Sequence, residues 1–402
     1  MPTYLSPGVY VEEIASGSAP IVGVGTSIAA FIGTINANAW SSNEAETGST
    51  SSGNEEVEDT TTNTIAQEGE IKLCTNFTEF KKFFGDFLLP SDETQGHNTL
   101  AHAVYGFFRN GGTRCYITWI TGTEEEVNEV LQQFEAIDEI TIVAAPGNLD
   151  LREKIAIHCK TMGDRIAVLD SDSYETIDLS NIDFVAALKP SELFESDYAA
   201  LYFPWIQVFD PSSGSNIYVP PSGHIAGIYA RVDGQRGVYK APGNETILGA
   251  LDLQHNLSKA KQGLLNPHGI NCIRKLNGNI RVWGARTLAG DDDQEFKYVN
   301  IRRHFNYLRD SIDKGTQWVV FDPNTPELWA KIRRNISAFL VNEWRQGALF
   351  GTTPEEAFYV KCDAETNPSE VRDLGQVITE IGVAVVKPAE FVIFRISQWD
   401  GQ

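Results

Sequence analysis

The sequence predicts an α/β protein built on a largely parallel sheet, with an extended segment at each end of the chain. First, short apolar segments of strand length alternate with amphipathic helical segments from Asn98 onward, which is the pattern of β-α-β units. Second, 42% of the residues are hydrophobic and 21% are charged, as in an ordinary folded protein. Third, 402 residues suffice for two or three domains, or for one large domain with an insertion.

The first α/β region begins with a buried strand and resumes after a polar stretch. Residues 41–64 are rich in Ser, Thr, Asn and Glu, so we expect a surface loop or a disordered insertion there. A helix from Asn98 is expected to end at Asn110-Gly-Gly, because glycine is a common helix stop. The remaining periodicities predict strands at 27–35, 115–120, 140–145, 165–169 and 199–209 and helices at 124–134, 152–162 and after Pro221.

A second α/β region begins near Asn271. We predict a helix here with Thr325 as its N-cap, Pro326 at the first helical position and Gly347 as its stop. Apolar residues at helical spacing give this helix an inner face of Leu328, Ile332, Ile336 and Phe339. We further predict a helix at 298–312 and strands at 280–285, 317–321, 357–361 and 376–384.

Both ends of the sequence predict extended arms. Val9 and Val11 alternate with Tyr10 in a short strand, and Phe391 to Ile396 is almost wholly apolar. An apolar strand left at an edge promotes aggregation, so each terminal strand must join its own sheet or that of another chain. The pattern favours strand exchange between subunits, carried by Val9, Tyr10, Val11, Phe391, Val392, Ile393, Phe394 and Ile396.

The charge of the chain is strongly acidic but uneven. The formal net charge of −22 disfavours nucleic acid as a partner, because phosphate binding needs a basic face. Between Lys297 and Arg345, however, nine basic residues outnumber five acidic ones. This basic island is either a pair of solvated helix faces or a docking face for an acidic partner.

Other features of the sequence bear on cofactors, compartment and membranes. The five cysteines are far apart and form no CxxC pair, so we expect buried thiols and neither disulfides nor a zinc site. His97 and His102 share no helix face well, which predicts no metal there. Nucleotide-binding motifs are absent from the sequence, and no cofactor is expected. No apolar run reaches membrane-span length and the N-terminus has no secretory pattern, so we expect assembly in the cytoplasm and no membrane insertion.

Two fragments resemble subtilisin-like proteases, which leaves a hydrolase as one alternative function. The segments around Ser27 and His224 are similar to those around that family's serine and histidine, and Asp170 ends a predicted strand. The order Ser, Asp, His differs from that family's order, and Ser27 lies in an apolar strand rather than at a helix start. The ordinary interpretation is that these residues are structural. A monomeric binding module that uses the acidic surface is a second alternative.

The chain resembles the sheath proteins of contractile phage tails, R-type bacteriocins and extracellular contractile injection systems. The resemblance spans nearly the whole chain except the polar stretch 41–64. It is carried, in order along the sequence, by Tyr4–Glu13, Phe107–Tyr116, Trp283–Leu288, Asn300–Arg303 with Trp318–Asn324, and Lys387–Phe391.

The resemblance implies a particular organisation of the chain. It implies an inner α/β domain built from both termini and a subtilisin-like outer α/β domain. The corresponding segments are an N-terminal arm at 1–22, the outer domain at 23–265, a tube-facing inner domain at 266–385 and a C-terminal strand arm at 386–402.

It also implies a function without catalysis. The subunits would form a helical polymer of stacked hexamers around an inner tube, in a metastable extended state, and contract to drive the tube through a target envelope. Implied partners are further copies of the chain, the tube protein, and baseplate and terminal cap proteins within a phage tail or released particle; whether paralogous sheath subunits co-assemble stays open. The basic island would contact the tube through Arg333 and Arg334, with Lys331 as a weaker candidate and Arg302 and Arg303 as the next.

Overall fold

The computed structural model describes most of the chain and divides it into two compact units. Described are residues 20–35, 66–91, 94–173, 185, 188–189, 196–289 and 293–395. The predicted strand around Val9–Val11, the polar stretch 41–64 and Ile396 lie outside these ranges. Unit 1 comprises Met1–Gly23 and Asp310–Ala384, and unit 2 comprises Val24–Arg309 and Val385–Gln402.

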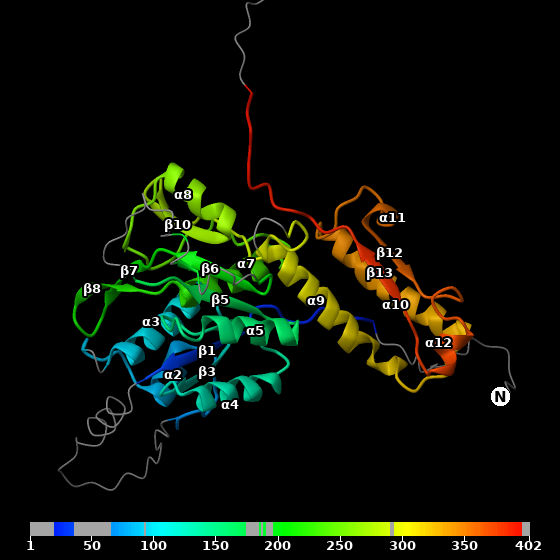
Figure 1. Cartoon of the computed structure of the whole chain (residues 1–402), viewed down its shortest axis with the longest axis horizontal. Helices are drawn as coiled ribbons and strands as arrows, with labels where there is room; N and C mark the ends of the chain where they lie inside the picture. The colour runs from blue at the N-terminus through cyan, green and yellow to red at the C-terminus, as the bar shows by residue number, and fades with distance from the viewer. Residues whose placement is uncertain are drawn as a thin grey trace, which may run out of the picture. The chain divides into compact units, whose positions relative to one another are not determined.

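Unit 2 is built around an eight-stranded sheet in the order β11-β10-β6-β5-β4-β1-β3-β2 (Figure 1). The six strands from β10 to β3 run parallel to their neighbours, and β11 and β2 add antiparallel edges. The prediction of an α/β fold with a largely parallel sheet is therefore confirmed. The strands are β1 (Ala29–Thr34), β2 (Lys72–Cys74), β3 (Cys115–Ile120), β4 (Ile142–Ala144), β5 (Ile166–Asp170), β6 (Ala199–Phe203), β10 (Ile270–Leu276) and β11 (Asn279–Val282).

Helices cover both faces of this sheet, which explains why its strands are apolar on both sides. On β1, Phe31 packs in a cluster with α3 and α7, whereas its neighbour Ile32 packs in another with α4 and α5. The helices of unit 2 are α2 (Phe77–Phe84), α3 (Gln95–Arg109), α4 (Glu124–Glu135), α5 (Arg152–Met162), α7 (Ser222–Arg236) and α8 (Lys259–Leu265), with the short η1 (Asn266–His268) and the start of α9 (Val299–Thr316).

Local sequence explains how these helices begin and pack. Thr123 and Glu126 form a capping box at the start of α4, which satisfies backbone N–H groups that have no partner within the helix. Glycine allows α7 to lie directly on α3, because a Cβ at Gly223 would sit 2.3 Å from the carbonyl oxygen of Ala103.

The prediction of one strand over 199–209 is wrong. β6 ends at Phe203 within the large sheet, and β7 (Ile206–Asp210) starts a separate antiparallel sheet with β8 (Ser215–Val219) and β9 (Asp252–Leu253). The two strands are adjacent in sequence and both apolar, so their hydrophobicity does not reveal the break at Pro204.

Unit 1 combines helices with a two-stranded sheet of β12 (Phe358–Lys361) and β13 (Glu380–Val383). The predicted cap is confirmed, because the Thr325 side chain accepts a hydrogen bond from the backbone N–H of Leu328 at the start of α10 (Pro326–Arg345). The predicted apolar face of α10 is buried, and Figure 1 shows α10 beside β12, which it contacts. The remaining elements are the end of α9, η2 (Gln317–Val319), α11 (Pro354–Ala357) and α12 (Ser369–Asp373).

Two predicted strands in this part of the chain need correction. The predicted strand 317–321 is a short 3-10 helix followed by Phe321 at φ +68°, and the predicted strand 376–384 is shortened to β13. Residues 266–309, which we assigned to the inner domain, belong to unit 2. The reason is that β10 pairs with β6 and continues the large sheet.

Candidate assembly site: the C-terminal arm and the basic helix

The C-terminal arm exposes a continuous run of large apolar side chains. Residues 385–395 form no helix or strand, and Figure 1 shows this segment extended, in red. Phe391, Val392, Ile393 and Phe394 are 70%, 68%, 79% and 83% exposed. Exposure of this much contiguous apolar surface is unfavourable in water and is typical of a surface that another chain covers.

The root of this arm is fixed by Glu390. Its carboxylate accepts hydrogen bonds from Arg286 Nε at 2.9 Å and Nη2 at 2.8 Å, from Asn266 Nδ2 at 2.8 Å and from the Tyr298 hydroxyl at 2.8 Å. Burial alone would raise the pKa of Glu390, but these hydrogen bonds outweigh it and hold that pKa below its ordinary value. The arm therefore leaves unit 2 from a fixed point.

The small sheet of unit 1 is a candidate acceptor for further strands. β12 and β13 pair in antiparallel register from Phe358 opposite Val383 to Lys361 opposite Glu380. No third strand pairs with β12 or β13 among the described residues. Two strands alone are only marginally stable, and backbone pairing at a sheet edge is a common way to bind an extended segment.

Arg302 and Arg303, the second choice for tube contact, are both buried within unit 2. Arg302 Nη1 lies 2.7 Å from Asp197 Oδ2. Arg303 binds both carboxylate oxygens of Asp233, at 3.0 and 2.6 Å, and donates to the carbonyl oxygen of Thr26 at 2.8 Å. Their side chains are only 9% and 4% exposed, so these contacts hold the interior of unit 2 together.

The three basic candidates on α10 differ in their surroundings. Arg333 is half-buried and donates a hydrogen bond from Nη1 to the carbonyl oxygen of Cys362. Lys331 and Arg334 are exposed and, three residues apart, are neighbours on the helix surface. The structure therefore makes Lys331 and Arg334 the more accessible pair, whereas the sequence favoured Arg333 and Arg334.

Ser27, Asp170 and His224, the residues of the hydrolase alternative, do not form a hydrogen-bonded triad. The carboxylate of Asp170 accepts hydrogen bonds from the Ser222 N–H at 2.8 Å, the Ser222 hydroxyl at 2.6 Å and the Gly147 N–H at 3.1 Å. Burial, with His102 and Arg109 nearby, lowers the pKa of His224 to about 3, which makes it a weak base. Asp170 thus holds the start of α7, and His224 is a neutral core residue.

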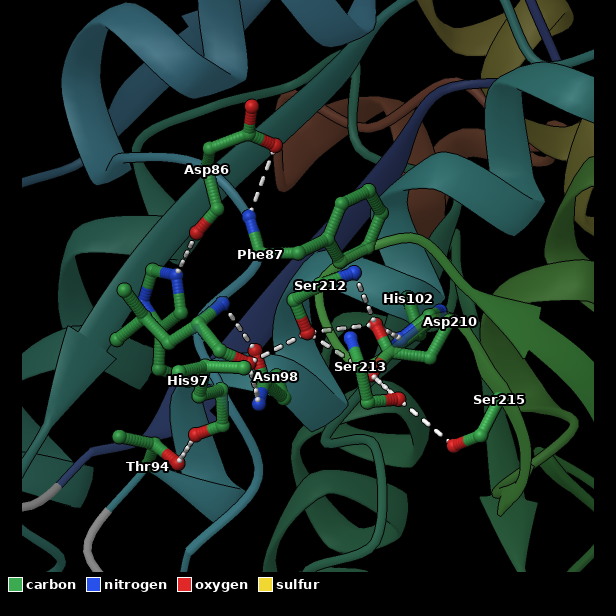
Figure 2. Close-up of polar contacts among 12 residues, drawn as sticks. Asp86, Phe87, Thr94, His97, Asn98, His102, Asp210, Ser212, Ser213 and Ser215 are labelled. Atoms are coloured by element: carbon green, nitrogen blue, oxygen red, sulfur yellow. Dashed lines mark hydrogen bonds and ion pairs between the residues drawn. The ribbon is translucent and has the colours of Figure 1, made fainter.

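Serine, histidine and aspartate side chains do meet at another place, where the β7–β8 turn contacts α3 (Figure 2). Asp210 accepts hydrogen bonds from the hydroxyls of Ser212 and Ser213, at 2.8 and 2.6 Å to Oδ2, and lies 3.4 Å from His102 Nε2. Because the serine hydroxyls donate to the carboxylate and not to an imidazole, the arrangement stabilises a turn rather than activating a nucleophile.

The same cluster ties the loop before α3 to the turn. The Asn98 side chain accepts from the Leu88 N–H at 2.8 Å and donates to the Leu88 carbonyl oxygen at 2.7 Å, and the Ser212 hydroxyl reaches that oxygen at 2.8 Å. His97 Nε2 lies 2.8 Å from the carbonyl oxygen of Asp86 (Figure 2). These histidines and polar groups serve the packing of unit 2.

The cysteines and the other potential metal ligands of the described residues show no sign of a reactive or metal-binding site. All five cysteines are free and buried, as the sequence predicted, and burial raises the pKa of Cys74 and Cys272 to about 12. The described ranges contain no group of three or more His, Cys, Asp or Glu side chains placed to hold a metal. None of the helices in those ranges is long and apolar enough to cross a bilayer.

Comparison with known protein families identifies the family of this chain. Residues 123–288 match the phage tail sheath protein central domain, and residues 291–398 match the phage tail sheath C-terminal domain. The chain belongs to the phage tail sheath protein family. The resemblance seen in the sequence is therefore confirmed.

Sheath proteins of known sequence and structure extend the match. A putative prophage major tail sheath protein of Pseudomonas aeruginosa (strain UCBPP-PA14) is 27% identical over 221 residues, which cover 54% of this chain and 55% of that protein. The chain spans about half, or less, of the length of the curated relatives it matches.

Solved structures match over nearly the whole chain. The contracted sheath complex of PVC, an extracellular contractile injection system, has a TM-score of 0.77 at 28% identity, covering 100% of this chain and 99% of that one. The contracted helical sheath of the anti-feeding prophage has a TM-score of 0.72 at 26% identity, covering 98% and 100%.

Sequence reasoning missed the residues that fix the two ends of unit 2. Asp233, which holds Arg303 and Thr26, and Arg286, which holds Glu390, are charged residues inside an ordinary helix and a short loop. The role of Glu390 could have been predicted from the sequence, because a charged residue directly precedes the apolar run Phe391–Ile396. Its partners lie 92 to 124 residues away, and no local pattern in the sequence connects them to Glu390.

Proposed function

We propose that this chain is the structural subunit of a contractile sheath. In this role it polymerises helically as stacked hexamers around an inner tube, is held in a metastable extended state, and contracts to drive the tube through a target envelope. The observation that carries the proposal is the likeness of nearly the whole chain to the contracted sheaths of two injection particles. The exposed arm adds to it, because an isolated globular protein gains nothing from such a segment.

The proposal is tested by co-expressing the chain with its tube protein and imaging the product by electron microscopy. We expect tubular particles of stacked rings that sediment as a polymer. A monodisperse monomer in size-exclusion chromatography under all conditions would favour a binding module instead. A serine-reactive probe that labels one serine stoichiometrically would favour a hydrolase.

The finer proposals concern partners and location. We expect contacts with further copies of the chain, with the tube, and with baseplate and cap proteins, and no catalytic role. We also expect assembly in the cytoplasm, followed by service in a phage tail or released particle. Unit 1, which carries α10 and the two-stranded sheet, would be the tube-facing part, and the α/β body of unit 2 would be the outer part.

Strand exchange is the proposed linkage between subunits. The exposed run at Phe391–Phe394 would supply the inserting strand, and the β12–β13 sheet, which has two strands among the described residues, would supply the acceptor. Backbone hydrogen bonds would give affinity, and the alternation of side chains would fix the register. Covalently intact arms could keep neighbours joined while the globular parts move.

Tube contact is tested by reversing the charge of the exposed pair on α10. The double variant Lys331→Glu, Arg334→Glu should weaken tube-templated assembly by roughly tenfold or more, because like charges would then face an acidic tube. High salt should weaken wild-type assembly in the same direction, since exposed charges are screened over about 8–10 Å. Assembly is measured as pelleted sheath per tube at increasing salt.

The matched control is Lys259→Glu, Lys261→Glu on α8, which makes the same charge change at two exposed lysines of unit 2. This control should assemble like wild type. If the α10 variant also assembles normally, with unchanged salt dependence, the assignment of α10 to the tube face is wrong.

A further inference from the structure

We propose that Arg286 and Glu390 form a clamp that fixes the root of the C-terminal arm to the sheet of unit 2. Its role is to pass a pull on the arm, exerted by a neighbouring copy during contraction, to the body of the subunit instead of letting residues 385–390 peel away. The inference rests on the proposed strand exchange and adds to it the residues that position the arm.

The clamp has the geometry of a strong attachment. Arg286 meets Glu390 through two parallel N–H···O bonds, and Asn266 and Tyr298 add one bond to each carboxylate oxygen. Bidentate arginine–carboxylate pairs are among the strongest hydrogen-bonded contacts in proteins. The side chains are 6% and 19% exposed, so solvent screens the pair only weakly. By contrast, Lys387 contributes one longer bond, from Nζ to the carbonyl oxygen of Gln294 at 3.4 Å.

The clamp is joined to the centre of unit 2 and not to a loose loop. The Asn271 side chain accepts from the Arg286 N–H at 2.7 Å and donates to the Arg286 carbonyl oxygen at 2.7 Å. Asn271 lies on β10, opposite Tyr202 of β6 in the parallel sheet. A pull on Glu390 thus reaches the eight-stranded sheet through Arg286 and Asn271.

Glycine at position 284 makes this connection possible. A Cβ at Gly284 would lie 2.8 Å from Asn271 Oδ1 and 2.9 Å from Asn271 Cα, closer than side chains tolerate. The backbone of Gly284 can therefore run against Asn271 and bring Arg286 into pairing distance two residues later. The segment Trp283–Leu288 thus builds the seat of the clamp.

The position of the clamp distinguishes it from an ordinary structural ion pair. Glu390 is followed immediately by the four exposed apolar residues of the arm. An arginine and a tyrosine also donate to a glutamate where Arg114 and Tyr116 meet Glu139. There the side chains of Arg114 and Glu139 are 42% and 36% exposed, and the site lies within the body of unit 2. It provides a matched control.

The test compares Glu390→Gln and Arg286→Lys with Glu139→Gln in the full chain. Amide hydrogen exchange of segment 385–390 in the unassembled protein should rise about tenfold in both clamp variants, as expected from losing charge-assisted hydrogen bonds. It should be unchanged in Glu139→Gln. Co-expressed with tube, the clamp variants should give sheath that fragments on triggering, whereas the control contracts intact.

Two further measurements separate a clamp from a general loss of stability. Tyr298→Phe removes one hydroxyl and should give an intermediate exchange rate with an unchanged melting temperature. Below the lowered pKa of Glu390 the protonated carboxyl no longer pairs with Arg286, so wild-type protection of 385–390 should fall as pH drops through that value, and Glu390→Gln should lack this step.

The outcomes are decisive in either direction. Unchanged exchange at 385–390 in Glu390→Gln, with sheath that contracts intact, overturns the clamp. If instead exchange rises as expected but a chain truncated after Glu390 still forms normal sheath, the clamp holds the root and the proposed strand exchange fails.

Discussion

A chain that ends at Glu390 is expected to fold normally and to form no sheath. The truncation removes Phe391–Phe394, which are exposed and contribute little to the core, and it keeps the contacts of Glu390 with Arg286. Folding is checked by circular dichroism and thermal melting, and assembly by electron microscopy after co-expression with tube. The physical reason is that, under the proposed strand exchange, the two-stranded sheet of a neighbouring copy would lose its inserting strand.

Two companion variants sharpen this prediction. Truncation after Val386 also removes Glu390, so Arg286 loses its carboxylate, but the same truncation removes residues 387–390 and lets water reach the guanidinium. We therefore expect a smaller loss of stability than for an arginine left buried without a partner. Deletion of residues 1–14 should likewise prevent assembly, if the N-terminal strand is exchanged too. Normal sheath from either terminal deletion would contradict strand exchange. Unfolding of the body would instead show that the deleted arm pairs within its own subunit.

Replacing Asp233 by Asn is expected to give the largest loss of stability among single isosteric substitutions in unit 2. Asp233 and Arg303 are 5% and 4% exposed, and Asp233 also accepts a hydrogen bond from the Thr26 hydroxyl at 2.6 Å. The substitution leaves a buried guanidinium without a countercharge, which costs about 3–5 kcal/mol. Urea unfolding monitored by circular dichroism measures the change in the free energy of unfolding.

The control is Glu139→Gln at the exposed pair with Arg114. This change should cost less than about 1 kcal/mol, because solvent screens exposed ion pairs. Equal losses at the two sites would mean that burial does not govern the strength of these pairs and would contradict the prediction for Asp233.

Local patterns in the sequence were enough to place many elements of the fold. The helix at Arg152–Met162 and the strand at Cys115–Ile120 have the predicted bounds, because periodicity and flanking turns act within a few residues. The Thr325 cap and the inner face of α10 were also predicted correctly. The exposed apolar arm was visible as a run with no polar partner nearby in sequence.

What the sequence could not predict depends on contacts between distant segments. The apolar run Trp318–Phe321 has strand composition, yet it ends a long helix in a 3-10 turn. The pairing of β10 with β6, which joins strands from separate regions of the chain, left no signal in the sequence. Arg302 and Arg303 looked like surface charges until the fold brought Asp197 and Asp233 to them.

The discontinuous path of the chain through its two units bears on the order of events during synthesis. The large sheet of unit 2 is complete in sequence at Val282, whereas unit 1 takes residues from both sides of it and its small sheet closes only at Val383. A ribosome releases the chain from its N-terminus onward, so the body can fold while the acceptor sheet does not yet exist. Under the proposed strand exchange, the acceptor sheet and the C-terminal arm therefore emerge last, after the N-terminal arm and the body, so this half of the exchange would be delayed until synthesis is nearly complete.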